Sequence, residues 1–353
     1  MTGSVLDAEG LRDRVQKRLD TFLESQAPLL DDVSDDLGPL IDTLRGLLTG
    51  GKRLRPAFCY WGWRGAAADD GDAIVDAATA LELLQACALI HDDVMDDSDT
   101  RRGQPSVHHR FAGLHRSSQW FGSPESFGTG AAILLGDLAL SWSDELFFRS
   151  GLPADALLRA KPVYDLMRTE LMAGQYLDLL EQARGGGSVE RALRVTRFKA
   201  AKYTIERPLH LGAALAGAPE TLLRTYSAYG LPLGEAFQLR DDVLGVFGDP
   251  TETGKPAGDD LREGKRTVLI AVALQQATPA QAAVVLRHLG DPHLSQRGID
   301  DLRAVLVDTG ALGHVEALIS TLTDQALASL SPVADPAREV LAQLAVAATA
   351  RRV

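Results

Sequence analysis

The chain has 353 residues, of which 45% are hydrophobic and 24% charged, and its formal net charge at pH 7 is −12. This composition is ordinary for a globular protein with a sizeable core, and the negative charge argues against nucleic acid as a partner. The sequence shows neither an uninterrupted apolar run of about 18 residues nor an N-terminal secretory leader, so we expect no membrane span and a cytoplasmic location. Its two cysteines, Cys59 and Cys87, are too few for a disulfide framework or a zinc site.

Helical periodicity runs along the whole sequence. Apolar faces with spacings of three and four residues occur over 11–22 and 37–47, and apolar helical runs follow over residues 73–91, 131–148, 155–182, 189–217, 220–247 and 266–287. Residues 299–351 contain at least two more such runs. Alternating runs of β-branched residues, which are typical of strands, are nearly absent. We therefore predict an all-α fold, a large helical bundle that forms a single domain over residues 1–353.

Gly, Ser and Pro mark the connections between these runs. Short connections are predicted at Thr49–Gly51, Ala66–Gly71, Gly185–Ser188 and Gly248–Asp260. The segment His115–Gly130, HRSSQWFGSPESFGTG, is rich in Ser and Gly and is predicted to be a loop extension.

A first acidic cluster, HDDVMDDSDTRRG, follows the apolar run at residues 77–90. Asp92 and Asp96 are four residues apart, so on a helix they share one face, a geometry that suits hard divalent cations. Carboxylates at a helix C-terminus oppose the helix dipole, so positive groups should compensate them. A solvated acidic helix end is an equally good reading of this cluster taken alone.

A second acidic cluster lies in FQLRDDVLGVFGD, where Asp241 and Asp242 interrupt another apolar helical run. Two aspartate pairs flanked by hydrophobic helix could face each other across one cavity, and a chance pairing of acidic surfaces is improbable. A carboxylate-bridged redox centre is disfavoured because the Glu-x-x-His spacing is missing.

Basic residues accompany both acidic clusters. They are Lys52, Arg53 and Arg55 in GGKRLRP, then Arg101, Arg102, Lys199, Lys202, Lys255, Lys265 and Arg266. A glycine turn with Lys and Arg can cradle phosphate, although GGKRLRP alone is more often a solvated turn and lacks the Walker spacing. Acids and bases together indicate a diphosphate ligand, bridged to the aspartates by Mg²⁺.

In this order, between about Gly50 and Arg266, the motifs resemble those of the trans-isoprenyl diphosphate synthases. The resemblance implies a helical bundle around a deep central cavity, usually a homodimer, that condenses isopentenyl diphosphate with an allylic diphosphate. It implies catalytic roles for Asp92, Asp93, Asp96, Lys199, Asp241 and Asp242, with about three Mg²⁺ ions held by Asp92, Asp96 and Asp241. The resemblance further implies that isopentenyl diphosphate is bound by Lys52, Arg55, Gln85 and Arg102. It implies that the allylic diphosphate is bound by Arg101, Lys199, Gln238 and Lys255.

Three positions depart from the family pattern. Gln85 stands where many members have a histidine, Gly245 replaces the last aspartate of the second motif, and Ala200 replaces a common threonine. An amide still donates a hydrogen bond, so we expect these changes to affect binding constants and not the reaction class.

Product length is predicted from the helix before Asp92. Ala88 and Cys87 lie four and five residues upstream, about 6–8 Å along a helix axis, and both are small. An aromatic side chain there would block chain growth, and Leu84, about 12 Å upstream, is the candidate for the next barrier. We predict a twenty-carbon product, geranylgeranyl diphosphate, with fifteen and twenty-five carbons as alternatives.

Two rival functions are compatible with such a fold. A class I terpene cyclase would use one allylic diphosphate, but GGKRLRP would then have no purpose and the second motif lacks the Asn/Ser/Glu pattern of cyclases. A non-catalytic subunit is disfavoured because both aspartate motifs are present.

Overall fold

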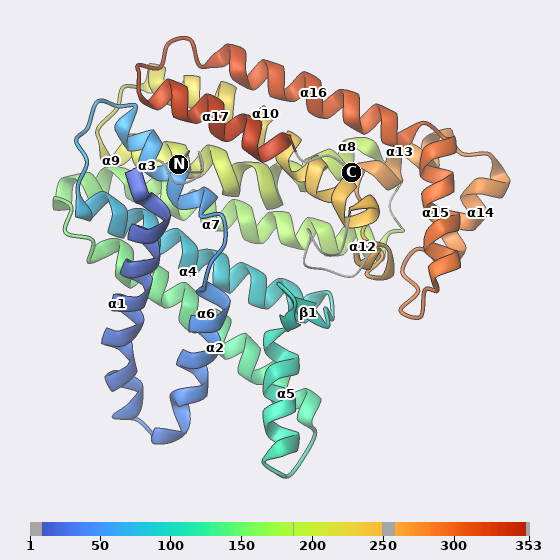
Figure 1. Ribbon diagram of the computed structural model, residues 1–353, viewed down its shortest axis with the longest axis horizontal. Coiled ribbons are helices and arrows are strands. Elements are labelled where there is room, and N and C mark those ends of the chain that lie inside the picture. Colours follow the sequence, from blue (N-terminus) through green and yellow to red (C-terminus); the bar gives the residue numbers. More distant parts are fainter. Residues whose placement is uncertain (1–8, 186, 249–257, 351–353) are drawn as a thin grey trace. The chain divides into compact units, whose positions relative to one another are not determined.

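The computed structural model describes residues 9–185, 187–248 and 258–350, and these confirm the predicted all-α fold (Figure 1). The backbone divides into two compact units. The N-terminal unit contains residues 1–161 and 211–218, and the C-terminal unit contains residues 162–210 and 219–353. That residues 1–353 form a single domain stays a prediction.

The N-terminal unit contains helices and one short hairpin. Its elements are α1 (Leu11–Asp31), η2 (Asp35–Leu37), α2 (Gly38–Leu48), α3 (Leu54–Arg64), α4 (Asp72–Met95), β1 (Thr100–Arg101), β2 (Gln104–Pro105), α5 (Val107–Ser117), α6 (Pro124–Phe148) and the first part of α7 (Ala154–Ala183). Helices α1 and α2 form an antiparallel pair, and α5 and α6 form another (Figure 1).

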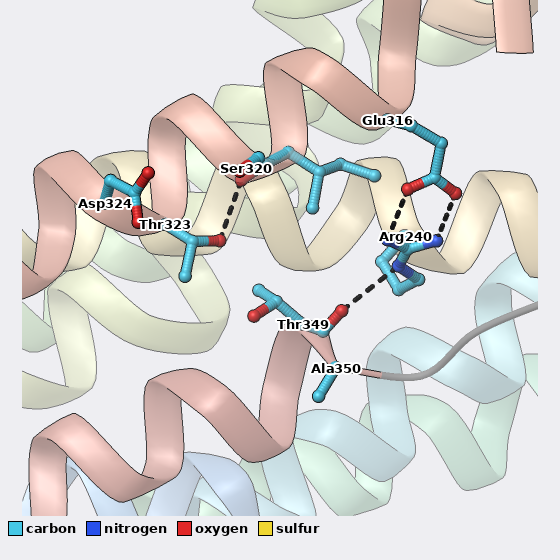
Figure 2. Close-up of a pocket in the computed structure, with 8 residues that line it drawn as sticks. Arg240, Glu316, Ser320, Thr323, Asp324, Thr349 and Ala350 are labelled. Carbon is cyan, nitrogen blue, oxygen red and sulfur yellow. Dashed lines mark hydrogen bonds and ion pairs between the residues drawn. The ribbon is translucent and has the colours of Figure 1, made fainter. Parts of the chain in front are cut away.

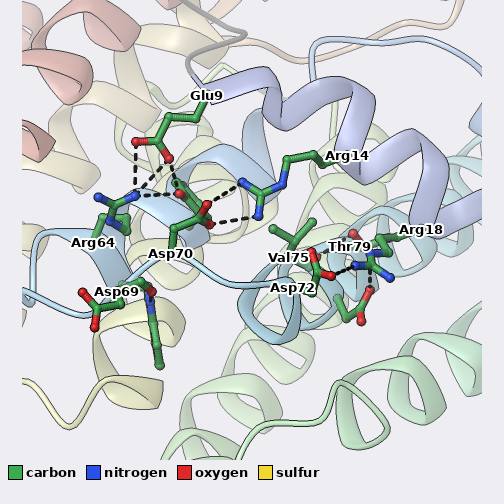
Figure 3. Close-up of polar contacts among 12 residues, drawn as sticks. Glu9, Arg14, Arg18, Arg64, Asp69, Asp70, Asp72, Val75 and Thr79 are labelled. Carbon is green, nitrogen blue, oxygen red and sulfur yellow. Dashed lines mark hydrogen bonds and ion pairs between the residues drawn. The ribbon is translucent and has the colours of Figure 1, made fainter.

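Helix α4 is the core helix of this unit and packs mainly against α6 and α3. It is long and apolar enough to cross a membrane, but 72% of its most apolar stretch is buried inside the protein, as in the core helix of a globular bundle. Charged partners tie its beginning to α1, where Arg18 contacts Asp72 and Asp76. In the same region Arg14 donates to Asp70, and Arg64 donates to Glu9 (Figure 3).

The RRG motif after α4 forms a tight β-hairpin turn. Strand residues Arg101 and Gln104 pair across the two-residue loop Arg102–Gly103, whose φ angles are 53° and 72°. Two positive φ angles define a type I′ turn, whose twist matches that of the flanking strands. The hairpin returns the chain to the end of α4, where the Ser106 N–H donates to the Asp99 carbonyl oxygen at 3.0 Å.

The predicted loop extension at His115–Gly130 is wrong. Helix α5 continues to Ser117 and α6 begins at Pro124, so only residues 118–123 connect them. The Ser123 side chain accepts a hydrogen bond from the Ser126 N–H, Pro124 supplies the first helical turn, and Glu125 complements the dipole. These helix-start signals outweigh the Gly and Ser content of the segment.

The C-terminal unit contains the rest of α7 and most of the later helices. They are α8 (Val189–Val195), η3 (Thr196–Glu206), α9 (Arg207–Leu215, of which residues 211–215 belong to the N-terminal unit), α10 (Glu220–Phe247), α12 (Asp259–Arg262), α13 (Val268–Gln276), α14 (Pro279–His288), α15 (Gln296–Asp308), α16 (Ala311–Ser329) and α17 (Ala337–Thr349).

Helix α10 is central to this unit and packs against η3 and α16. A Cβ atom on Gly234 would lie 2.5 Å from the Cα atom of Ala201, so only glycine allows α10 and η3 to approach this closely. The η3 segment is a π-helix over eleven residues, a form that is rare and common at functional sites.

Candidate active site

The first aspartate motif lies at the C-terminal end of α4, as predicted. Arg101 compensates it: its Nε donates to Asp93 Oδ1 at 2.9 Å, and its Nη2 lies 3.6 Å from Asp92 Oδ2. The Asp93 side chain is 2% exposed and the Asp92 side chain 15% exposed. The positive partner expected for these acids is therefore present, and it comes from the hairpin.

Arg102 extends from the same hairpin toward the GGKRLRP segment. Its Nη1 donates to the Leu47 carbonyl oxygen at 2.9 Å, and a Cβ atom on Gly51 would lie 3.3 Å from its Nη2. Burial lowers the pKa of Arg102, Glu82 raises it, and the like charges of Arg53, Arg101 and Arg55 lower it further. The positive charges of three other guanidinium groups thus act on Arg102, which favours an anion beside it.

The three cations of GGKRLRP have different environments. Arg53 is buried, pairs with buried Glu82 and donates to the Leu48 carbonyl oxygen and to Gln16 Oε1, the last at 2.6 Å. Lys52 and Arg55 are half-buried. Arg53 therefore has a structural role, and Lys52 and Arg55 remain the candidates for phosphate binding.

The second aspartate motif lies in the last two turns of α10. Gln238 Nε2 donates to Asp242 Oδ1 at 2.8 Å. The pKa of Asp242 is raised to about 7, mainly because the side chain is buried. The hydrogen bond from Gln238 and the charge of Lys265 lower this pKa, whereas the charges of Asp260 and Asp241 raise it. Gln238 thus contacts the motif itself, in keeping with its predicted membership of the site.

Sequence reasoning missed Asp260. A Cβ atom on Gly245 would overlap with Asp260 Oδ2 and lie 2.8 Å from its Cγ, so the Asp260 carboxylate fills the space that a side chain at position 245 would occupy. Where the second motif has glycine in place of its last aspartate, a carboxylate from α12 therefore occupies the adjacent space. Lys265 Nζ lies 3.4 Å from Asp260 Oδ1. The acidic dipeptide Asp259–Asp260 was the available signal.

Lys199 lies on the π-helix η3 and donates to Asp178 Oδ2 of α7 at 2.6 Å. A Cβ atom on Gly174 would lie 2.7 Å from the Lys199 Cα atom, so this glycine lets η3 approach α7. Lys202 donates instead to Glu170 at 2.7 Å, which separates its environment from that of Lys199. Lys255, the other predicted allylic-site lysine, lies outside the described residues.

The predicted product-length residues differ in exposure. Leu84 and Cys87 are 0% and 1% exposed, and the Cys87 Sγ lies 3.7 Å from His91 Nδ1. Ala88 is half-buried, as are Gln85 and Asp92 on the same helical stripe.

The donor chemistry of both motifs fits a hard divalent cation. Asp92 and Asp96 follow each other at helical spacing, because the Asp96 N–H donates to the Asp92 carbonyl oxygen at 2.8 Å. At the second motif Asp260 and Asp241 raise the pKa of Asp242, an effect that a cation bound there would oppose. The residues present thus fit Mg²⁺, whose ligands are oxygen atoms.

A pocket of about 480 Å³ in the C-terminal unit involves other residues (Figure 2). Arg240 forms a bidentate pair with Glu316, and its Nε donates to the Thr349 carbonyl oxygen at 3.2 Å. None of the predicted site residues lines this pocket.

Comparisons with known proteins bear on the whole chain. A family model described as polyprenyl synthetase matches residues 40–305. The chain is 44% identical to a geranylgeranyl pyrophosphate synthase of Corynebacterium glutamicum, which was crystallised with isoprenyl diphosphate and magnesium. The TM-score is 0.94, over 97% of this chain and 99% of that one.

Relatives from archaea carry names that differ in product length. A geranylfarnesyl diphosphate synthase of Aeropyrum pernix is 30% identical over 82% of this chain and 86% of its own length. A geranylgeranyl diphosphate synthase of Sulfolobus acidocaldarius is 31% identical over 75% of this chain and 76% of its own length.

Proposed function

Because this chain belongs to the polyprenyl synthetase family and is a trans-prenyltransferase, we propose that it elongates an allylic diphosphate with isopentenyl diphosphate. The observation that carries the proposal is the RRG hairpin. It holds Arg101 on the first aspartate motif and Arg102 beside GGKRLRP, so one turn serves two groups of side chains in the N-terminal unit. That division supports separate roles for the two arginines, Arg101 on the allylic diphosphate and Arg102 on isopentenyl diphosphate.

The reaction begins with cleavage of the allylic carbon–oxygen bond, which leaves a delocalised carbocation and a diphosphate anion. Arg101, Lys199, Gln238 and Lys255 hold the allylic diphosphate, and the positive charges among them stabilise the anion as it forms. About three Mg²⁺ ions, held by Asp92, Asp96 and Asp241, supply further neutralisation of that diphosphate when bound.

Lys52, Arg55, Gln85 and Arg102 hold isopentenyl diphosphate, whose alkene attacks the carbocation. A new carbon–carbon bond forms, and a proton leaves the adjacent carbon for the departing diphosphate. Apolar surroundings exclude water, which would otherwise capture the carbocation.

We propose geranylgeranyl diphosphate as the main product. Ala88 supports this proposal because it is small and lies on the same half-buried stripe as Asp92. Cys87 is buried beside His91 and is the weaker candidate for a floor residue.

We also propose a homodimer in the cytoplasm. Exposed apolar side chains gather on α6, where Phe127 is 38%, Ile133 44% and Leu134 67% exposed, and a second copy of the chain would cover them. We expect the purified chain to sediment at twice the mass of one chain, and sedimentation at the mass of a single chain would contradict the dimer.

One assay tests the proposed reaction. Purified protein is incubated with Mg²⁺, isopentenyl diphosphate and a labelled allylic diphosphate, and products are extracted and weighed by mass spectrometry. We expect elongated diphosphates, no turnover after chelation, and none in Asp92→Ala or Asp241→Ala. Asp42→Ala, an exposed acid on α2, serves as the matched control.

Two outcomes contradict the proposal. Consumption of the allylic diphosphate without any need for isopentenyl diphosphate indicates a cyclase. Near-normal turnover of Asp92→Ala at saturating Mg²⁺ means that the metal ligands are assigned wrongly.

A further inference from the structure

Three side chains in the N-terminal unit gather at the start of α5, outside the residues that the reaction uses. Asp97, His108 and His109 each offer a ligand atom, and these atoms all lie within 4.8 Å of one another. His108 Nε2 is 3.8 Å from Asp97 Oδ1, and the two imidazole rings lie 4.2 Å apart, centroid to centroid. Among the described residues, this is the one such group of three.

The hairpin explains how the three side chains meet. Asp97 follows the first aspartate motif in a left-handed conformation, with φ of 52°, which aspartate tolerates better than most residues. The hairpin then reverses the chain, so that the first turn of α5, with His108 and His109, lies beside residues 97–99. Asp99 Oδ1 lies 3.2 Å from His109 Nε2 and adds a second carboxylate at the edge of the group.

His108 carries a buried nitrogen that is left without a partner. The residue is 7% exposed, and its Nε2 has no hydrogen-bond partner among the described residues. Its Nδ1 lies 3.3 Å from the Ser106 hydroxyl oxygen. When Nδ1–H donates a hydrogen bond to that oxygen, Nε2 carries a lone pair that is free to bind a cation. A buried polar atom without a hydrogen-bond partner lowers the stability of the folded protein by about 1–3 kcal/mol, so a ligand bound to this nitrogen would be stabilising.

The environment of His108 favours the neutral form of its side chain. Burial lowers the pKa of His108 and so does His109, against the opposing effects of Asp97, Asp93 and Asp99. The neutral imidazole that results is the form that binds metals.

We propose that Asp97, His108 and His109 form a binding site for a first-row transition cation, and that Zn²⁺ fits it best. Two imidazoles and a carboxylate are ligands that Zn²⁺ prefers, whereas Mg²⁺ prefers oxygen ligands alone. Ligand atoms at about 2.1 Å from Zn²⁺ lie about 3.4 Å apart, so small side-chain rotations from the observed spacing suffice. Water or Asp99 would complete the tetrahedron. The inference does not depend on the proposed reaction.

Zinc binding to the whole chain tests the inference. The purified protein is stripped with a chelator, dialysed into Mg²⁺ to fill the aspartate motifs, and titrated with Zn²⁺ against a chromophoric chelator. We expect one Zn²⁺ per chain, and about tenfold or greater weakening in His109→Ala and in Asp97→Asn. Both residues lie at or near the surface, so these variants should fold, which circular dichroism checks.

Matched variants make the result decisive. His314→Ala removes an exposed histidine from α16 and should bind Zn²⁺ like the wild type. Asp92→Ala should also retain the zinc site. With Co²⁺ in place of Zn²⁺, the visible absorption of a site with imidazole ligands should appear in the wild type and disappear in His109→Ala. Equal affinity in all four variants, no zinc binding by the wild type, or loss of zinc in Asp92→Ala alone overturns the inference.

Discussion

Loss of the Arg53 charge should destabilise the protein, whereas loss of the Lys52 charge in the same GGKRLRP turn should leave its stability almost unchanged. Arg53→Met keeps an apolar stem but removes the guanidinium from a pair whose side chains are 2% and 7% exposed. Glu82 would then be a buried carboxylate without its partner. Breaking a buried pair on one side typically costs about 3–5 kcal/mol of unfolding free energy, and we expect a loss in that range.

The expected change in melting temperature follows from the chain length. An unfolding entropy of about 2.1 cal/mol/K for each of the 353 residues gives about 0.7 kcal/mol/K. A loss of about 3–5 kcal/mol therefore corresponds to a decrease of about 4–7 °C, measured by differential scanning calorimetry. Lys52→Met, at a half-buried position in the same turn, should change stability by no more than about 0.5 kcal/mol.

A double variant separates the ion pair from general damage to the turn. Arg53→Met with Glu82→Leu replaces both charges by apolar groups, which in buried pairs is often neutral. We expect it to regain most of the lost stability. If Arg53→Met melts within about 1 °C of the wild type, or if the double variant melts lower than the single one, the structural role of Arg53 is refuted.

Three further substitutions test the site. Arg55→Ala should raise KM for isopentenyl diphosphate about tenfold or more and KM for the allylic substrate less, in steady-state kinetics; equal increases would contradict separate binding sites. Ala88→Phe should shorten the product, read by mass spectrometry, and an unchanged product rules out Ala88 as a floor residue. Gly245→Ala should lower the unfolding free energy by about 1–3 kcal/mol, because the new methyl group displaces the Asp260 carboxylate. Gly313→Ala is the control: no atom lies within 4 Å of the new methyl group, and the unfolding free energy should increase by about 0.5–1 kcal/mol. Higher melting temperatures in both glycine variants would contradict the Gly245 contact.

Periodicity is sufficient to predict the helices that carry the two aspartate motifs, because its signal is local. The apolar run before Asp92 reads as a buried helix, and α4 is one. The charge cluster also predicted that positive groups would compensate the acids, and Arg101 does so. The segment 115–130 was misread because its Gly and Ser content hid the helix start at Ser123 and Pro124.

Features that depend on tertiary packing were beyond local reasoning. Nothing in the spacing of GGKRLRP distinguishes Arg53 from Arg55; burial against Glu82 does. The role of Asp260 depends on its contact with Gly245, fifteen residues earlier. From the sequence, η3 was predicted to be an ordinary α-helix, because hydrophobic spacing does not reveal the change from i→i+4 to i→i+5 hydrogen bonds.

The hairpin turn has a consequence for engineering a more thermostable variant. Arg102 occupies a left-handed position, with φ of 53°, that glycine or asparagine would adopt at lower energetic cost, by about 1–2 kcal/mol. A selection for heat resistance alone would therefore favour Arg102→Gly, and each round would enrich chains whose turn has lost this guanidinium. A selection that keeps Arg102 would have to couple survival to product formation, because stability favours glycine at this position whereas the proposed binding of isopentenyl diphosphate requires arginine.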